Sequence, residues 1–234
     1  MQFEEFSNIV SAEFPGLTGE QIDLFRRMEP LYRDWNSRIN VISRKDIDGF
    51  YEHHVLHSLA IASYWLREGI LSSGHSERSE GSPALSVLDV GTGGGFPGIP
   101  LAVMFPGLDF TLCDSVGKKT IVAKAVAESL GLPNVTVVNA RAESLPGKFD
   151  FVVSRAVTTL DNFYPWVRDS FRYSIFYLKG GDVNEEIAQL MGRNRLKKGS
   201  VRTWRVDNWL QSEYFQEKFV IQIEKDYLCS PIVE

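Results

Sequence analysis

The sequence is poor in cysteine and lacks both long apolar runs and a basic leader. Its 234 residues include two cysteines, Cys113 and Cys229, which form no C-x-x-C pair. They are typical of buried thiols in a reducing compartment rather than of a disulfide or a zinc site. No apolar run approaches the ~18 residues that a membrane helix needs. Residues 1–6 are acidic where a signal peptide is basic, so we expect a cytoplasmic protein without membrane contact.

The chain also lacks an overall positive charge. Its formal net charge of −5 does not favour a nucleic-acid-binding protein, but it hides a local asymmetry. Residues 192–205 contain no acid and the basic side chains Arg193, Arg195, Lys197, Lys198, Arg202 and Arg205. A second basic group consists of Arg33, Arg38, Arg44 and Lys45. Each group alone fits a solvated face as well as a binding surface.

Length and composition fit one α/β domain with a small helical extension. The apolar share of 44% and the charged share of 24% are those of an ordinary globular protein. Residues 1–71 form the expected helical extension, 72–84 a polar linker, and 85–234 the main domain. Thr18 and Gln21 resemble a capping box, and Pro30 is expected to kink or divide the helix that follows. A second helix is expected from near Asp46 to before Gly69.

The main domain reads as alternating strands and helices. Apolar runs at 86–90, 109–113, 135–138, 149–154 and 174–178 predict buried strands, and 118–130 predicts a helix ending at Gly131. This order predicts a mostly parallel sheet, and the alternating segments 201–206 and 219–224 predict its antiparallel end. Ligands of such sheets lie beyond the carboxyl ends of the strands. That rule places around one crevice the residues Gly91, Asp114, Glu143 and Arg155.

The most informative segment is the glycine-rich stretch at residues 86–98, SVLDVGTGGGFPG. Residues 93–98 satisfy the G-x-G-x-x-G pattern of dinucleotide-binding loops, with Asp114 as a ribose-binding acid. Residues 89–95 satisfy the D-x-G-x-G-x-G pattern of Rossmann-like methyltransferases that use S-adenosylmethionine. A pyrophosphate needs free N–H groups where the next helix begins, and Pro97 and Pro100 remove two of them. The second interpretation is therefore favoured, with a nicotinamide-dependent oxidoreductase as the alternative.

A wider set of motifs resembles one family. Residues 87–101 resemble the signature of the RsmG (GidB) family. Further matches, in the expected order, are WN at 35–36, INVIS at 39–43, HVLHS at 54–58, TLCDS at 111–115, GKK at 117–119, ARAE at 140–143, VSRA at 153–156 and KGG at 179–181. Two departures are a linker longer than the family usually has and His57, where many members carry an acid.

The resemblance implies a function and a fold. It implies a class I, Rossmann-like methyltransferase that transfers a methyl group from S-adenosylmethionine to guanine N7 in 16S ribosomal RNA of the small subunit. The implied cofactor contacts are Gly91, Gly93, Phe96, Asp114, Ala142, Glu143 and Arg155. Asp114 would accept the ribose hydroxyls, Ala142 and Glu143 would border the adenine, and Arg155 would lie near the methyl group and the target base. Without the resemblance, a surface ion pair is the alternative for Glu143 and Arg155.

Guanine N7 carries no proton at neutral pH, so the reaction needs alignment rather than a general base. Arg155 is thus expected to position the substrate. His53, His54 and His57 have metal-ligand spacings, but no acid or cysteine completes a set, so no metal site is expected. With an RNA acceptor, the two basic groups become candidates for phosphate contacts that flank the crevice, foremost Arg193, Arg195, Lys197, Lys198, Arg44 and Lys45. We expect a monomer; a non-catalytic RNA- or ribosome-binding protein stays a third interpretation.

Overall fold

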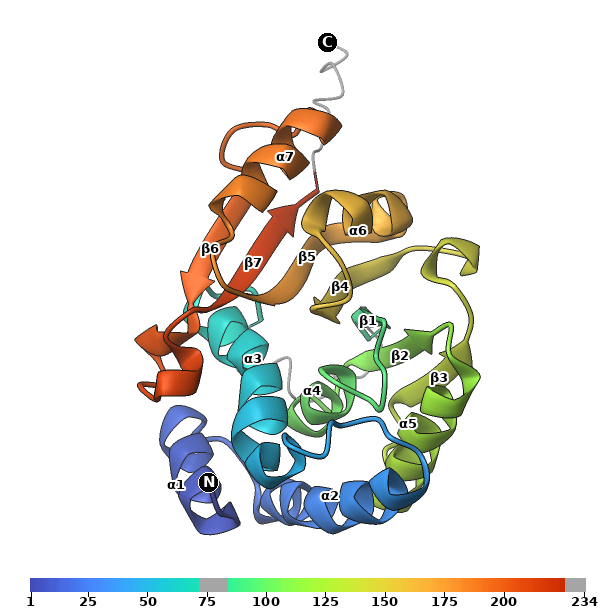
Figure 1. Cartoon of the computed structure of the whole chain (residues 1–234), viewed down its shortest axis with the longest axis vertical. Helices are drawn as coiled ribbons and strands as arrows, with labels where there is room; N and C mark the ends of the chain where they lie inside the picture. Colours follow the sequence, from blue (N-terminus) through green and yellow to red (C-terminus); the bar gives the residue numbers. More distant parts are fainter. Residues whose placement is uncertain (72–83, 226–234) are drawn as a thin grey trace.

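The computed structural model describes residues 1–71 and 84–225 (Figure 1). Residues 72–83 of the expected linker and Cys229 lie outside the described residues, and Cys113 is a buried free thiol. The division of the chain into an extension, a linker and a main domain stays a prediction.

Within the described residues, seven strands form one sheet in the order β3-β2-β1-β4-β5-β7-β6. The strands are β1 (Ser86–Val90), β2 (Asp109–Asp114), β3 (Val135–Asn139), β4 (Phe149–Arg155), β5 (Phe171–Gly180), β6 (Val201–Arg205) and β7 (Lys218–Glu224). The first five pair in parallel, whereas β7 runs antiparallel to both β5 and β6. The sheet therefore confirms the expected mostly parallel architecture with an antiparallel end.

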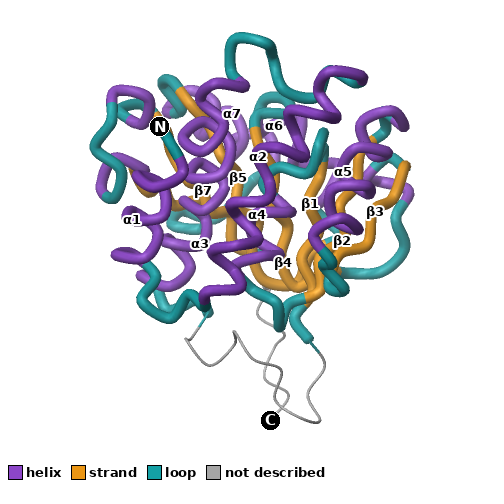
Figure 2. The backbone as a smooth tube through the Cα atoms, turned by 90° about the horizontal axis from the view of Figure 1, so that it is seen from below, coloured by secondary structure: helices purple, strands orange, loops and turns teal. Residues whose placement is uncertain are grey.

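Helices cover both faces of the sheet (Figure 2). They are α1 (Phe3–Glu13), α2 (Gly19–Arg38), α3 (His57–Arg67), α4 (Gly98–Met104), α5 (Gly117–Leu130), α6 (Leu160–Val167) and α7 (Asn184–Asn194). Successive strand residues point to opposite faces. Val87 and Phe110 accordingly belong to the core that packs against α1 to α5, while Leu88 and Val152 belong to the core beneath α6 and α7. The N-terminal helices thus share one core with the sheet.

Helix α2 begins with the expected capping box but is not divided at Pro30. Thr18 and Gln21 exchange both capping hydrogen bonds, at 3.0 and 3.2 Å. Of the two expected effects of Pro30, a kink or a division, division is excluded, because α2 continues through Pro30 to Arg38. A proline leaves the carbonyl four residues earlier without its helical donor. That carbonyl belongs to Arg26, and the hydroxyl of Tyr51 lies 3.4 Å from its oxygen.

The second expected helix is three segments of different pitch. Ile47–Gly49 is a 3₁₀ turn, Phe50–Leu56 is a π-helix, and α3 then runs from His57 to Arg67. The expectation of one regular helix from Asp46 was therefore wrong. π-helical segments are rare in proteins, and those that occur often lie at functional sites. This one carries His53 and His54 to the carboxyl edge of the sheet, where Arg155 contacts both residues.

Candidate active site

The loop after β1 is organised by a buried aspartate. Asp89 is fully buried, and its Oδ2 accepts hydrogen bonds from the Thr92 hydroxyl at 2.6 Å and from the Gly98 amide at 2.8 Å. Gly91 follows with φ +69°, and a Cβ there would lie 2.5 Å from a methyl group of Val157. Glycine is thus required both by the backbone conformation and by the close approach of a neighbour.

The helix after the loop offers no free donor to an anion. Its first residue, Gly98, donates to Asp89, and Ile99 donates to the carbonyl of Gly95 at 2.8 Å. Pro100 has no N–H, and Leu101 donates to the carbonyl of Pro97. Dinucleotide loops hold a pyrophosphate with the free amides of this turn. The whole first turn of α4, and not its prolines alone, is therefore unsuited to a pyrophosphate.

Asp114, at the end of β2, faces the same loop. Its Oδ2 accepts the Gly93 amide at 2.9 Å and its Oδ1 accepts the Val116 amide at 2.8 Å. A carboxylate has about four acceptor positions, so two remain for a ligand. The pair of ribose hydroxyls of a nucleoside fits this remaining capacity. The side chain is 93% buried yet borders a cavity, so it is rigid where a ligand would sit.

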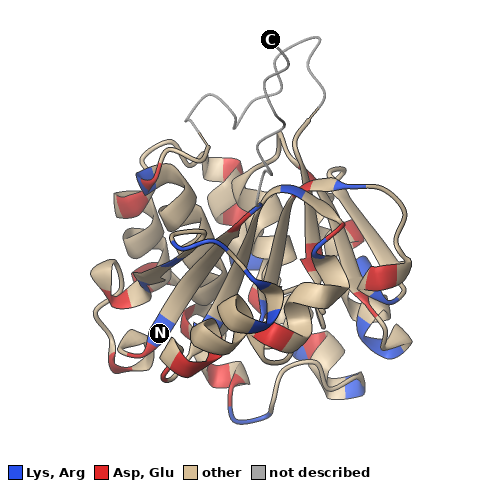
Figure 3. Cartoon of the chain, turned by 90° about the horizontal axis from the view of Figure 1, so that it is seen from above, with Lys and Arg blue, Asp and Glu red and all other residues tan. Residues whose placement is uncertain are grey.

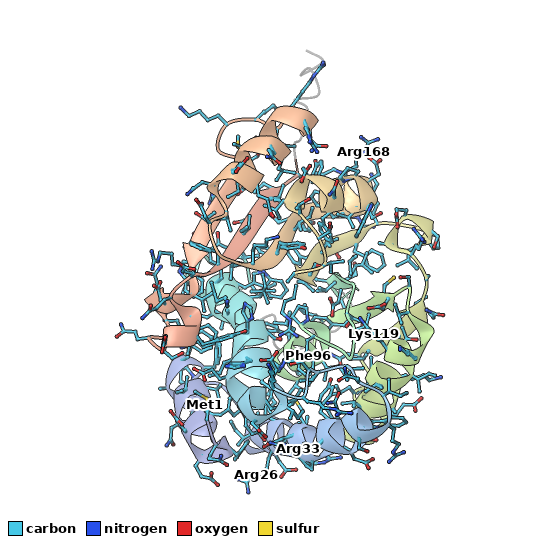
Figure 4. The ribbon with its side chains drawn as sticks, in the orientation of Figure 1. Met1, Arg26, Arg33, Phe96, Lys119 and Arg168 are labelled. Carbon is cyan, nitrogen blue, oxygen red and sulfur yellow. The ribbon has the colours of Figure 1, made fainter. Side chains whose placement is uncertain are left out.

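The cavity beside Asp114 has a volume of about 450 Å³, within the usual range for small-molecule sites. Five of the expected cofactor residues line it: Gly91, Asp114, Ala142, Glu143 and Arg155. Gly93 and Phe96 are outside its lining. Gly93 acts through its hydrogen bond to Asp114, and Phe96 is buried behind the loop against Tyr32. Figure 4 labels Phe96, which lies in the interior among the helices.

Other lining residues were not singled out from the sequence: Val116, Lys119, Arg141, Val157 and Trp166. Lys119, labelled in Figure 4, and Arg141 stand inside motifs already quoted, so their spacing from Asp114 and Glu143 was an available signal. Trp166 comes from α6 and carried no local signal. Its place depends on the crossover from β4 to β5, which contains α6.

Arg155 lies between the cofactor-sized cavity and the N-terminal helices. Its guanidinium donates to the carbonyl oxygen of His53 and to Nδ1 of His54, both at 3.0 Å, and lies over the ring of Phe96. Within residues 1–71 and 84–225, no carboxylate forms an ion pair with it. The alternative of a surface ion pair between Arg155 and Glu143 is therefore wrong. A half-buried cation with neutral partners is suited to an incoming anion or carbonyl oxygen.

The histidines line a second cavity of about 270 Å³, which shares Arg155 and Ala156 with the first. Because arginine can only donate, Nδ1 of His54 must be an acceptor and Nε2 must carry the proton. Burial, and then the charge of Arg155, lowers the pKa of His54 to about 3, so the ring stays neutral. Among the described residues no group of three or more His, Cys, Asp or Glu side chains is placed to hold a metal ion.

The basic residues after α7 do not gather at these cavities. The strand register places Ser200 beside Glu224 and Ser174, level with Phe151 and Val87 near the amino ends of the strands. Both cavities lie at the carboxyl ends, about six residues or 20 Å further along the sheet. The expectation that Lys197 and Lys198 flank the crevice is therefore wrong.

Several other cations of the two basic groups are bound to acids. The pairs are Arg193 with Asp161, Arg205 with Asp207, Arg202 with Glu224, Arg33 with Glu29 and Asp48, and Arg38 with Asp34. In the view of Figure 3, basic and acidic positions are intermingled over the chain. Arg44 and Lys45 differ, because they are exposed and stand directly before Asp46, which lines the second cavity. These two are the expected RNA contacts that lie beside the site.

Comparison with known proteins decides the family. The family model described as "rRNA small subunit methyltransferase G" (GidB) matches residues 21–207. The chain belongs to this family. Relatives named ribosomal RNA small subunit methyltransferase G include one from Christiangramia forsetii, 41% identical over 92% of this chain and 95% of that protein. Another, from Bacteroides fragilis (strain ATCC 25285), is 44% identical over 90% of this chain and 96% of that protein.

Solved structures show the same fold at low sequence identity. The magnesium protoporphyrin IX methyltransferase of Synechocystis superposes with a TM-score of 0.57 at 18% identity, covering 85% of this chain and 97% of that one. The 16S rRNA N2 G1207 methyltransferase of T. thermophilus gives 0.52 at 17% identity, covering 81% and 45%. The class I methyltransferase fold expected from the sequence is thereby confirmed. Among the described residues, no helix of this GidB-family chain has the length and apolar character to span a membrane.

Proposed function

We propose that this chain transfers a methyl group from S-adenosylmethionine to N7 of a guanine in 16S ribosomal RNA. The family membership supports a small-subunit rRNA methyltransferase. The choice of cofactor rests on the hydrogen-bonding groups around Asp114, at the carboxyl edge of the sheet. An acceptor with two free positions stands there beside a helix start without free amides, which suits a nucleoside that has no phosphate. An rRNA acceptor also favours a cytoplasmic enzyme, and we expect it to act as a monomer.

Asp114 and the cavity lining fit this cofactor. The carboxylate would hold the ribose hydroxyls, and the aliphatic side chains of Val116 and Ala142 would border the adenine. Gly91 lines the cavity, and its backbone would border the sulfur end of the molecule. When bound, S-adenosylmethionine supplies an electrophilic methyl group on a positively charged sulfur.

The residues of the chain have an aligning role in the reaction. Guanine N7 has a lone pair and no proton, so no side chain has to act as a general base. The lining of the first cavity offers no serine or cysteine beside a histidine that could act as its base. Holding the acceptor and the methyl carbon in line contributes several kcal/mol, up to about 7–11. Arg155, at the junction of the two cavities, would hold O6 of the guanine or a phosphate. It would not stabilise the positive charge that develops on the purine.

Ligand binding and methyl transfer test this function together. S-adenosylhomocysteine at 100 times its Kd should raise Tm by roughly 5–10 °C, whereas NADH should leave it unchanged. Methyl label from S-adenosylmethionine should then enter the RNA of unmodified small ribosomal subunits and not that of large subunits. Stabilisation by NADH alone would favour the oxidoreductase. Stabilisation by S-adenosylhomocysteine without transfer to any rRNA would favour a non-catalytic binding protein.

A further inference from the structure

Of the proposed cofactor contacts, Arg155 alone lines the second cavity. This cavity opens where β4 and β5 end, and its lining includes His53 and His54 of the π-helix, Lys179 of β5, Tyr214 of the 3₁₀ turn Glu213–Phe215, and Lys218 at the start of β7. Residues 214 and 218 lie beyond the part of the chain that the family model matches. Because Arg155 and Ala156 border both cavities, a molecule in the second cavity would face the reactive end of a ligand in the first.

The cavity carries an aromatic wall. The rings of His53 and Tyr214 stack with centroids 4.0 Å apart and an angle of 17° between their planes. Both side chains are only half-buried, so part of this wall is accessible. Aromatic side chains on which a base stacks are the usual means of holding an unstacked nucleotide. The ammonium group of Lys218 lies over the Tyr214 ring, so a nucleobase turned out of its helix would stack on Tyr214 in place of that group.

The cavity also has hydrogen-bonding and charged groups without partners. His54 is 92% buried, and its Nε2–H makes no hydrogen bond within the described part of the chain. Lys218 has no ion pair among these residues either, and its ammonium group lies 4.9 Å from the centre of the Tyr214 ring. Lys179 is bound to Glu186, and Asp46, the acid of the lining, is bound to His53. Lys218 therefore remains available to an anion in this cavity.

The backbone between the two cavities is strained in a way that supports a site. Ala156, which directly follows Arg155, has φ +46°, an unusual value for a residue with a side chain. Such conformations cost about 1–3 kcal/mol and cluster at functional sites. The amide of Ala156 is held by the carbonyl of Leu178 at 3.2 Å, which fixes the junction of the cavities to β5.

We propose that the second cavity receives the acceptor guanine, extruded from the RNA and stacked on the His53–Tyr214 wall. This inference rests on the proposed methyl transfer. Guanine presents the acceptor O6 beside N7, and the guanidinium of Arg155 matches O6 while the lone pair of N7 stays free to attack the methyl group. Lys218 would bind the phosphate next to the extruded nucleotide, since enzymes that modify bases take them out of the stack. Tyr214 and Lys218 are therefore substrate-binding residues of this chain.

Photo-crosslinking tests the site without relying on turnover. 6-Thioguanosine monophosphate, irradiated with the protein saturated with S-adenosylhomocysteine, should label peptides that contain residues 53–57 or 214–218. The substitution Tyr214→Ala should abolish this labelling, whereas the matched control Tyr173→Ala, at an exposed tyrosine near the amino end of β5, should not. Labelling confined to other peptides, or labelling that Tyr214→Ala leaves intact, would overturn the proposal.

Kinetics test the same site in the full reaction. Tyr214→Ala should raise KM for unmodified small subunits about 10- to 100-fold at unchanged affinity for S-adenosylhomocysteine. Tyr214→Phe keeps the aromatic ring, so its KM should stay close to that of the wild type. Lys218→Gln should lower the slope of log affinity against log salt by about 0.7–0.9, and Lys124→Gln on α5 should not. Wild-type KM in both site variants would overturn the cavity proposal alone. Absence of transfer by the wild type would overturn the proposed function, while the crosslinks still decide the cavity.

Discussion

Asp89, near the end of β1, and Asp114, at the end of β2, have different roles in the site. Asp114 borders the cavity and keeps acceptor positions for a ligand, whereas Asp89 is fully buried and bonds only to the loop. Burial raises the pKa of Asp89 to about 7, and its Oδ1 has no hydrogen-bond partner among the described residues. The sequence pattern predicted both positions, but it carried no sign that one carboxyl group is so poorly solvated.

Replacing Asp114 by asparagine should weaken cofactor binding. Both carboxylate oxygens accept backbone amides, so the NH₂ group of the introduced amide side chain would face a donor. Hydrogen bonds to a charged group contribute about 1.5–3 kcal/mol, so affinity for S-adenosylhomocysteine should fall about 10- to 150-fold. Isothermal titration calorimetry measures this, with Asp34→Asn at an exposed site of α2 as the matched control. Equal affinity in Asp114→Asn and wild type would show that this carboxylate does not hold the ligand.

Asp89 should make stability depend on pH. Its pKa of about 7 in the folded chain compares with about 3.9 when unfolded, so between these values the folded state holds the extra proton. Stability therefore falls as pH rises from about 4 to 7, and the full cost, on the order of 4 kcal/mol, is present above pH 7.

The variant Asp89→Asn keeps the shape of the side chain but has no group that titrates in this pH range. Denaturant unfolding at pH 5 and pH 8 should show the variant gaining stability relative to wild type at the higher pH. A difference between the two proteins that stays constant with pH would contradict the assignment of this titration to Asp89.

At the scale of elements, local signals predicted where segments begin and end better than how they continue. The capping box at Thr18 and the left-handed Gly131 after α5 stand where the sequence predicted them. Pro30 and the 50–56 segment were not predictable, because a distant side chain, Tyr51, lies at the carbonyl that the proline leaves free. Residues 50–56 likewise contact distant segments, since Arg155 of β4 and Tyr214 of the turn before β7 both contact His53.

Gln21 should contribute more than a helix cap. Besides its capping bond to Thr18, its Nε2 donates to the carbonyls of Val103 at 2.8 Å and Met104 at 3.1 Å, where α4 ends. Gln21→Ala should therefore lower the free energy of unfolding by about 1–3 kcal/mol, measured in urea. Gln189→Ala, an exposed glutamine within α7, should change it by less than about 0.5 kcal/mol. Equal losses in the two variants would exclude a special role for Gln21.

At the scale of the whole molecule, the sequence predicted a mostly parallel sheet with an antiparallel end, the alternation of strands and helices along the chain, and most of one cavity. It could not predict the second cavity, because His53, Arg155 and Tyr214 are brought together from three distant segments. It also assigned Lys197 and Lys198 to the crevice on charge alone. Only the antiparallel register of β6 and β7 shows that these two lysines lie near the opposite edge of the sheet, at the amino ends of the parallel strands.

The two basic groups should consequently differ in RNA binding. Arg44 and Lys45 stand beside the second cavity, so reversing both charges to glutamate should weaken binding of small-subunit RNA and lower its salt slope by about 1–2. The same reversal at Lys197 and Lys198 should have a smaller effect. Filter binding over a series of salt concentrations measures both quantities, with affinity for S-adenosylhomocysteine as the check on folding. A larger effect at residues 197 and 198 would mean that RNA approaches the opposite edge of the sheet.

The most direct test of the account is the chemical identity of the methylated product. Small ribosomal subunits without the modification are incubated with the enzyme and S-adenosylmethionine that carries a labelled methyl group, and their RNA is digested to nucleosides. The account predicts label in 7-methylguanosine, and loss of this label in Asp114→Asn and Tyr214→Ala under conditions where substrate is limiting. Label in any other nucleoside, or in protein, would contradict it.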